Sequence, residues 1–271
     1  MTSSLIDQNW AAYSLEDHQT WTRLYDRLAA LLPGRAAPAF MGGLTALDLH
    51  AGGIPNFNEL SEALEALTGW QVVGVPGLVP DAEFFALLAD RKFPAGTFIR
   101  RPDQFDYIQE PDVFHDVFGH VPMLTDPVFA NYMQAYGEGG LRSLRHCGLR
   151  NLAALYWYTV EFGLIETPEG LRIYGAGILS SPAETVFCLE SPSPNRLRFD
   201  LERVMCTDYK IDDFQQTYFV ISSYEDLFHA TVDRDFAPLY ARMRNRFLHG
   251  PQVVRACDQV IQQGTQTERS L

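Results

Sequence analysis

The chain has 271 residues, 46% of them hydrophobic, and carries a formal net charge of −13 with a pI near 4.9. This length supports one large domain or two small ones with a substantial core, and the acidic balance argues against nucleic acid or an anionic membrane surface as a partner. No apolar run approaches the ~20 residues that span a bilayer. The first residues do not resemble a signal peptide, and the four cysteines are scattered without a CxxC pair. We therefore expect a cytoplasmic protein without disulfide bonds.

The first third of the chain predicts helices separated by short extended segments. Residues 1–12 are polar, and we expect them to be flexible. Ser14 and Asp17 resemble a capping pair at the start of the next helix, in which His18 is interpreted as a surface or packing residue. Asn56 and Gly69 are typical of the start and end of a later helix. Apolar spacing predicts helices at 15–32, 40–49, 56–68 and 81–90, and extended segments at 71–75 and 97–100.

Two histidines, His115 and His120, lie five positions apart in the segment 110–124. Pro111 suits the first turn of a helix, and Gly119 is typical of a helix end. His115 is therefore expected on a short helix and His120 just beyond it. Residues five apart on a continuous α-helix point away from each other, so a chain reversal at Gly119 would be needed to bring the two imidazoles together. A pair of core or surface histidines is the commoner explanation of such a spacing.

Glu161 lies in the nearly apolar run 152–164, inside a helix expected at 149–163. A carboxylate there is costly unless it is paired, protonated or bound to a cation. Many such residues simply pair with an arginine. Two histidines and one carboxylate with open positions beside them nevertheless form the facial triad of non-haem Fe(II) oxygenases.

The remaining segments complete an α+β chain that is mostly helical with short strands. We expect helices at 127–136, 182–189, 224–231 and 236–246, strands at 171–174, 197–204 and 218–222, and a sharp turn at 175–177. No repeat or linker divides the chain, so we expect a single catalytic domain at 13–261 and a flexible tail at 262–271.

The motifs HDVFGHVP at 115–122 and YWYTVEFGL at 156–164 resemble the pterin-dependent aromatic amino acid hydroxylases, and the likeness runs from about Asp17 to about Tyr240. The resemblance implies the same fold and an Fe(II) held by His115, His120 and Glu161. It also implies a tetrahydropterin and O2 as further reactants. The expected reaction is the hydroxylation of L-phenylalanine to L-tyrosine. Family members with regulatory or oligomerisation segments are longer, so we expect a monomer.

The resemblance also implies a pterin site. Phe84 would stack on the bicyclic ring, and Leu78, Val79, Asp81 and Ala153 would lie at its edge. The family often has Ser at the position of Asp81. From the stretch alone, the simpler interpretation of Phe84 is a core residue of its helix.

Further residues near the centre follow from the same resemblance. Asp116 and Tyr156 match residues beside the iron, although Asp116 could be only a first-turn charge. Glu184 matches an acid that orients a ligand histidine.

Substrate contacts are implied as well. Arg100 matches an arginine that binds the amino acid carboxylate, while the adjacent Arg101 is interpreted as solvated. Gly177 and Ser180 match positions near the amino acid. Trp157 matches the aromatic wall of the ring pocket and favours phenylalanine or tyrosine over tryptophan.

Two other functions use the same residues. A zinc hydrolase could use the three ligands, but HDVFGH has neither of the common zinc peptidase spacings, and zinc has no redox chemistry. A binding module with a purely structural triad would bind an aromatic amino acid without turnover.

Overall fold

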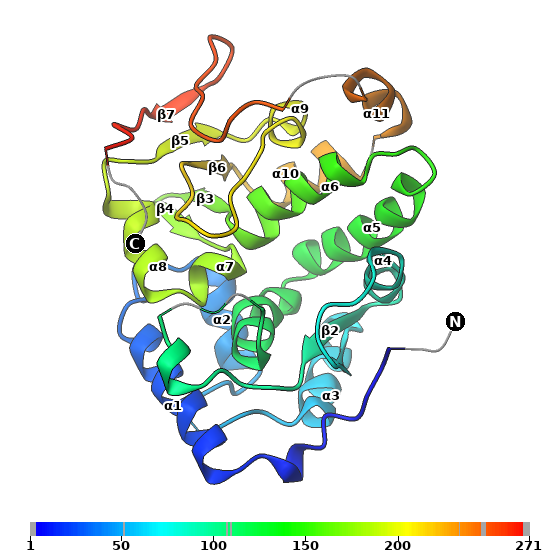
Figure 1. The fold of residues 1–271 in the computed structure, drawn as a ribbon, viewed down its shortest axis with the longest axis vertical. Coiled ribbons are helices and arrows are strands. Elements are labelled where there is room, and N and C mark those ends of the chain that lie inside the picture. Colours follow the sequence, from blue (N-terminus) through cyan, green and yellow to red (C-terminus); the bar gives the residue numbers. More distant parts are fainter. Residues whose placement is uncertain are drawn as a thin grey trace.

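The structure is a computed structural model that describes residues 4–50, 52–106, 108, 110–232, 234–244 and 248–267. Helices dominate and short strands form two sheets (Figure 1), which confirms the expected α+β class. The α-helices are α1 (Leu15–Ala29), α2 (Pro38–Ala46), α3 (Phe57–Thr68), α4 (Asp81–Ala89), α5 (Pro127–Ser143), α6 (Leu149–Tyr156), α7 (Ala176–Leu179), α8 (Pro182–Glu190), α9 (Leu201–Met205), α10 (Tyr224–Thr231) and α11 (Ala237–Met243). The 3-10 helices are η1 (Trp10–Ala12), η2 (Pro102–Gln104) and η4 (Val121–Thr125), and the π-helices are η3 (Phe114–His120) and η5 (Trp157–Glu161).

The larger sheet has the strand order β4–β3–β6–β5–β7. Its strands are β3 (Leu164–Thr167), β4 (Gly170–Ile173), β5 (Asn195–Arg198), β6 (Thr217–Ile221) and β7 (Val260–Gln262). The central strand β6 runs parallel to β3 and β5, and all of its residues are buried. The smaller sheet pairs β1 (Gln71–Val75) with β2 (Lys92–Gly96) in parallel, and α4 connects the two strands. The strands predicted at 71–75, 171–174 and 218–222 are thus confirmed within a residue or two.

The other extended segments differ in part from the prediction. The extended segment expected at 97–100 lies after β2, which contains Pro94. Proline lacks a ladder donor and weakens a strand pattern in the sequence. The strand expected at 197–204 ends at Arg198, because the Asp200 side chain accepts a hydrogen bond from the Arg203 N–H and starts α9. Strands β3 and β7 were not predicted.

Local capping signals were better guides. The Ser14 side chain and Asp17 form a reciprocal capping box at the start of α1. Asn56 accepts from the Asn58 N–H at the start of α3, and Gly69 ends that helix at φ 76°. His18 is a packing residue as expected, since its Nδ1 accepts a 3.1 Å hydrogen bond from the Ile54 N–H.

Helix α5 is longer than the predicted 127–136, because glycines in its second half do not break it. A Cβ at Gly137 would lie 2.4 Å from the Ala89 nitrogen, and one at Gly140 would lie 2.0 Å from Phe85 Cδ1. These glycines therefore allow α5 to pack closely on α4, which is a tertiary reason that a single sequence does not display.

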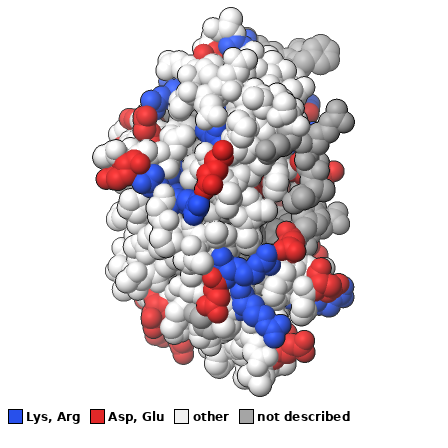
Figure 2. Space-filling view, turned by 90° about the vertical axis from the view of Figure 1, so that its left-hand side faces the viewer, with Lys and Arg blue, Asp and Glu red and all other residues white. Residues whose placement is uncertain are grey.

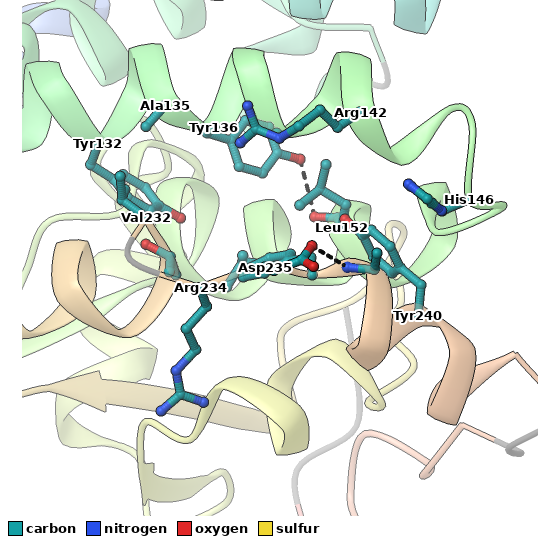
Figure 3. A pocket seen from close by; sticks show the side chains of 15 residues that line it. Tyr132, Ala135, Tyr136, Arg142, His146, Leu152, Val232, Arg234, Asp235 and Tyr240 are labelled. Carbon is teal, nitrogen blue, oxygen red and sulfur yellow. Dashed lines mark hydrogen bonds between the residues drawn. The ribbon is translucent and has the colours of Figure 1, made fainter.

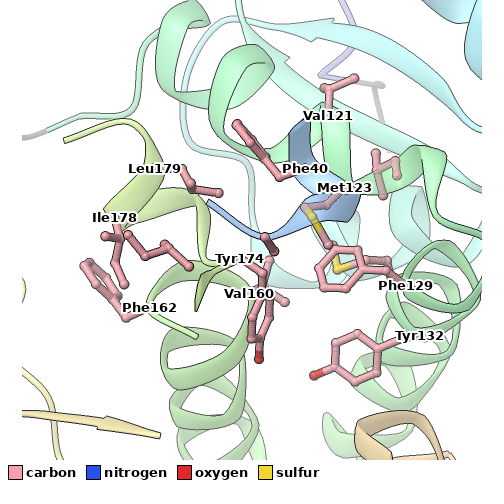
Figure 4. Packing of buried hydrophobic residues seen from close by; sticks show 14 of the residues in the cluster. Phe40, Val121, Met123, Phe129, Tyr132, Val160, Phe162, Tyr174, Ile178 and Leu179 are labelled. Carbon is pink, nitrogen blue, oxygen red and sulfur yellow. The ribbon is translucent and has the colours of Figure 1, made fainter. Parts of the chain in front are cut away.

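One hydrophobic cluster runs through the molecule and surrounds the segments that carry the candidate site. Figure 4 shows Met123 near Phe129 of α5, with Tyr132 below them and Ile178 and Leu179 of α7 on the other side. Phe114 and Phe118 of η3 stack at 4.7 Å between ring centroids and are fully buried. The site is therefore built on the core rather than on surface loops.

The first described residues lie against this body. Ser4 donates to Glu83 of α4, and Ile6 forms a bridge with Gly74 of β1. On the face shown in Figure 2, acidic and basic side chains lie next to one another. Among the described residues, no helix is both long and apolar enough to cross a membrane. The flexible ends and the single domain at 13–261 stay predictions, and part of the tail and of the helix expected at 236–246 lies outside the described residues.

Candidate metal centre

His115 and His120 lie on one face of the same helix, η3, because that helix is a π-helix. A π-turn bonds residue i to i+5, so side chains five apart lie on one face, whereas on an α-helix they would diverge. The two Nε2 atoms are 3.3 Å apart. The chain reversal predicted at Gly119 is therefore wrong. Gly119 instead allows close contact with α7, since a Cβ there would lie 3.0 Å from the Ala176 carbonyl oxygen.

Glu161 is presented by the second π-helix, η5. The Phe162 N–H donates to the Trp157 carbonyl across this turn at 2.8 Å. The Glu161 carboxylate oxygens lie 3.2 Å from His120 Nε2 and 3.7 Å from His115 Nε2. One ligand atom from each of the three residues can be chosen so that all lie within 4.8 Å of one another. Two π-helices thus place the predicted triad on one face of a small site.

Helix α7 holds the two π-helices together, and the turn predicted at 175–177 is wrong because this helix begins there. Gly175 packs on the backbone of η5, and a Cβ there would lie 2.4 Å from the Glu161 carbonyl oxygen. The backbone of Gly177 packs against the Glu161 carboxylate, since a Cβ there would lie 3.2 Å from Glu161 Oε2. Neither glycine has a positive φ, so close approach rather than a turn explains them.

The protonation states at this site suit a divalent metal. Burial lowers the pKa of His115 to about 4, so the imidazole is neutral at neutral pH. The Ser180 hydroxyl donates to the Ala176 carbonyl at 2.8 Å and lies 2.9 Å from His115 Nδ1. It must therefore accept from Nδ1–H, which leaves the lone pair of Nε2 directed into the site. Burial would raise the pKa of Glu161, but the neighbouring histidines outweigh it and hold that pKa below its usual value.

The donor set consists of two imidazole nitrogens and one carboxylate. These are the ligands and the number that the Fe(II) facial triad uses, with further coordination positions left for reactants. The residues present therefore fit an iron ion.

Asp116 and Tyr156 flank the centre. Burial raises the pKa of Asp116 to about 7, although the carboxyl accepts a 2.8 Å hydrogen bond from the Gly96 N–H. The Tyr156 ring lies 6.3 Å from the His120 ring, and burial raises its phenol pKa well above the usual value. The phenol therefore stays protonated and can donate a hydrogen bond.

Of the predicted pterin residues, Phe84 contacts Tyr156. Phe84 is partly buried and meets the Tyr156 ring edge-on at 5.7 Å between centroids. Ala153, on the preceding turn of α6, is half-buried. Leu78 is 82% exposed, and Val79 and Asp81 lie near it at the start of α4. The fold brings Phe84 towards the centre and leaves Leu78 facing solvent.

Arg100 is buried and forms a bidentate pair with Asp112, at 2.9 Å from Nε and 2.8 Å from Nη2. The guanidinium holds the pKa of Asp112 below its usual value against the effect of burial. Asp112 also accepts from the His115 N–H at 3.0 Å, so it connects Arg100 to the centre. This link through Asp112 was not predicted from the sequence. Arg101 is 74% exposed beside Asp103, as expected for a solvated neighbour.

Trp157 and Glu184 belong to a second group of contacts. The Trp157 indole packs on Phe162 and donates to Gln215 Oε1 at 2.9 Å. Glu184 accepts from the Tyr218 hydroxyl at 2.7 Å and from the Gln215 N–H at 3.2 Å. These bonds of Glu184 involve neither histidine, and Ser180 contacts His115 in the way that was expected of Glu184. Gln215 carried no signal in the sequence.

A separate cavity lies between α5, α6 and α11 (Figure 3). Tyr132, Tyr136, Arg142, Leu152 and Tyr240 line part of it. The Tyr136 hydroxyl donates to the Leu152 carbonyl at 3.0 Å, and its ring lies 5.2 Å from that of Tyr156. Tyr136 therefore lies between this cavity and the metal centre.

Comparisons with known proteins agree on one family. The family model for biopterin-dependent aromatic amino acid hydroxylases matches residues 8–256. A phenylalanine-4-hydroxylase of Caulobacter vibrioides is 60% identical over 261 residues, which cover 96% of this chain and 88% of that protein. The structure of Chromobacterium violaceum phenylalanine hydroxylase with iron and phenylalanine bound matches at a TM-score of 0.92 and 52% identity, over 96% of this chain and 94% of that one. A structure of the same enzyme with iron(III) and oxidised 7,8-dihydrobiopterin matches at 0.92 and 54%, over 96% and 93%.

Proposed function

The chain belongs to the biopterin-dependent aromatic amino acid hydroxylase family, and from that premise we propose that it is a phenylalanine 4-monooxygenase. It hydroxylates L-phenylalanine to L-tyrosine with O2 and a tetrahydropterin at a non-haem Fe(II). The observation that carries the proposal is the cluster of His115, His120 and Glu161, whose ligand atoms lie within 4.8 Å of one another. Relatives named phenylalanine-4-hydroxylase at up to 60% identity support the substrate.

His115, His120 and Glu161 are the proposed metal ligands. Bound iron and reduced pterin together supply the activation of O2, which no side chain here could supply. The protein contributes a rigid ligand set. Ser180 fixes the His115 tautomer, and the backbone of Gly177 packs against the Glu161 carboxylate.

Phe84 is the proposed stacking face for the pterin, with Leu78, Val79, Asp81 and Ala153 around its edge. Its position beside Tyr156 supports this assignment. Asp116 is the proposed acid near the pterin. A carboxyl with a pKa near 7 can be protonated and donate to a ring nitrogen, or be ionised and accept from an N–H. Tyr156 can donate to a group bound at the centre.

Arg100 is the proposed anchor of the substrate carboxylate, because Asp112 fixes the plane of its guanidinium in a buried site. Trp157 is the proposed wall of the slot that holds the aromatic ring, and Gly177 beside Glu161 and Ser180 beside His115 are proposed to lie near the amino acid. A fixed carboxylate and a fixed ring would place one ring carbon at the centre and exclude water.

Oxygen uptake tests the function. We expect tyrosine formation to require phenylalanine, Fe²⁺ and a tetrahydropterin together, with O2 consumed in step. A zinc hydrolase would bind zinc without O2 uptake, and a binding module would bind phenylalanine without turnover.

We further propose that the protein acts as a cytoplasmic monomer in phenylalanine catabolism. The acidic composition and the absence of any disulfide among the described cysteines support the compartment. Light scattering during gel filtration would measure the oligomeric state, and a mass of a dimer would overturn that part of the proposal.

A further inference from the structure

One irregular loop, residues 208–216, contacts the indole of Trp157 on its face and on its edge. Tyr209 stacks on the indole with ring centroids 4.5 Å apart and planes 16° apart. Gln215 accepts the indole N–H at 2.9 Å. The loop therefore limits both the tilt of the indole and its rotation in its own plane.

Gln215 is itself held in one orientation. It is 2% exposed, and its Nε2 donates to the carbonyls of Lys210 at 3.1 Å and Asp213 at 3.3 Å. A flipped amide would place two donors against the indole N–H and an oxygen against two carbonyls. The backbone N–H of Gln215 also donates to the buried Glu184 carboxyl. Three hydrogen bonds thus hold the acceptor that meets Trp157.

Trp157 is joined to the metal centre by close packing. Its ring lies 4.6 Å from that of Phe162. Phe162 Cζ and Glu161 Oε2 lie 2.8 Å and 3.2 Å from the point that a Cβ on Gly177 would occupy. A displacement of the indole would therefore alter the space directly beside Glu161.

Given the proposed function, in which Trp157 lines the slot for the substrate ring, we propose that Gln215 is a positioning residue that sets the selectivity for the ring. By holding the indole edge, it keeps the slot narrow enough for a phenyl ring and too narrow for the larger ring of tryptophan. Gln215 does not touch the substrate and acts through Trp157.

Gln215→Met tests this, because it keeps the length of the side chain and removes the acceptor. The matched control is Gln216→Met, which alters the same residue type at the next position, for which no side-chain bond to Trp157 is seen among the described residues. Iron- and pterin-loaded protein is assayed with L-phenylalanine and L-tryptophan. We expect Gln215→Met to lower the ratio of kcat/KM for phenylalanine to that for tryptophan roughly fivefold, the scale of one hydrogen bond. Less tyrosine should form per pterin oxidised, and Gln216→Met should change neither value.

Trp157→Phe removes the indole N–H and provides the second test. In that background Gln215→Met should change the selectivity ratio by less than about twofold, because the bond is already lost. An equal drop in both backgrounds would mean that Gln215 acts through the loop alone and would overturn the proposal. So would an unchanged ratio in an active Gln215→Met enzyme.

Tryptophan fluorescence of metal-free protein gives a readout that needs no turnover. The emission of Trp157 is obtained by subtracting the spectrum of Trp157→Phe. We expect Gln215→Met, and not Gln216→Met, to increase its quenching by acrylamide. Unchanged quenching would overturn the positioning role. A wild-type protein that forms no tyrosine would instead overturn the proposed function and the ring slot with it.

Discussion

At the scale of single residues, Arg100 already binds a carboxylate before any substrate arrives. Asp112 is fully buried and accepts hydrogen bonds from Nε and Nη2 of the Arg100 guanidinium. Such a pair adds little net stability, but removing one partner leaves a buried charge without compensation. The pair therefore fixes the guanidinium in place and makes its removal costly for the fold as well as for binding.

We expect Arg100→Ala to lower kcat/KM for phenylalanine by about 2–5 kcal/mol of transition-state binding and to uncouple pterin oxidation from tyrosine formation. Arg100→Lys should restore only part of the lost kcat/KM, because an ammonium group cannot form the bidentate contact. Steady-state kinetics and tyrosine formed per pterin oxidised are the measurements. Arg101→Ala is the control, since Arg101 is exposed. A damaged Arg101→Ala beside an intact Arg100→Ala would refute the assignment of the anchor.

Glu184 gives a pH-dependent prediction. Burial raises its pKa from 4.5 to about 7 in the folded protein. The folded state then binds more protons than the unfolded state between these values, so this group's contribution to stability is present below about pH 4.5 and is lost as the pH rises to 7. Glu184→Gln keeps an acceptor for Tyr218 and cannot ionise.

The variant should therefore match the wild type at pH 4 and exceed its free energy of unfolding at pH 8 by at most about 3 kcal/mol. Urea denaturation at both pH values measures this. Iron affinity should not change, because the hydrogen bonds of Glu184 run to Tyr218 and Gln215. A stability difference that is the same at both pH values would contradict the prediction, and weaker iron binding would restore the orienting role first expected of Glu184.

At the scale of elements, Gly137 and Gly139 of α5 provide a test substitution and its matched control. A Cβ at Gly137 would clash with the backbone of α4, whereas at Gly139 its nearest neighbour would be the flexible end of Arg142 at 3.7 Å. Gly137→Ala should therefore destabilise the fold by roughly 1–3 kcal/mol through overpacking.

Gly139→Ala should be neutral or stabilise by up to about 1 kcal/mol, because alanine favours the helix. Thermal unfolding of both variants measures the difference. If both variants were stabilised, the close packing of α5 on α4 would not hold in solution.

The helices also differ in how much of each the sequence predicts. Caps are read from a few neighbouring residues, so the starts of α1 and α3 could be predicted. The length of α5 could not be predicted, because Gly137 is explained by its close packing on α4, a helix distant in the sequence. The ligand types at His115, His120 and Glu161 could be predicted, yet the π-turns that bring them together could not. A pattern of apolar residues indicates a helix but does not fix its number of residues per turn.

At the scale of the whole molecule, the candidate centre joins segments far apart in the chain. Residues from η3 and η5 would be linked through one ion, and both segments lie in the main core. Ligands that bind only the folded state stabilise it by a free energy that grows with the logarithm of their concentration relative to Kd.

Fe²⁺ at about 100 times Kd should therefore raise the free energy of unfolding by about 2.7 kcal/mol, which corresponds to a rise in Tm on the order of 5–10 °C. Anaerobic thermal unfolding with and without Fe²⁺ or a chelator measures it. Glu161→Ala should lose this rise in Tm and all hydroxylation while keeping the fold. If Glu161→Ala retained the full rise in Tm, Glu161 would not be a ligand.

The π-helices also limit how this protein can change over evolution. Most insertions and deletions are absorbed by loops, but a single deletion between His115 and His120 would leave an i,i+4 pair, which shares a face on an ordinary α-helix and not on the π-helix found here. An insertion within η5 would likewise rotate Glu161 away from its partners. The centre thus fixes the number of residues in two segments as well as their identity. In alignments of chains that keep this centre, gaps should therefore fall outside 114–120 and 157–161.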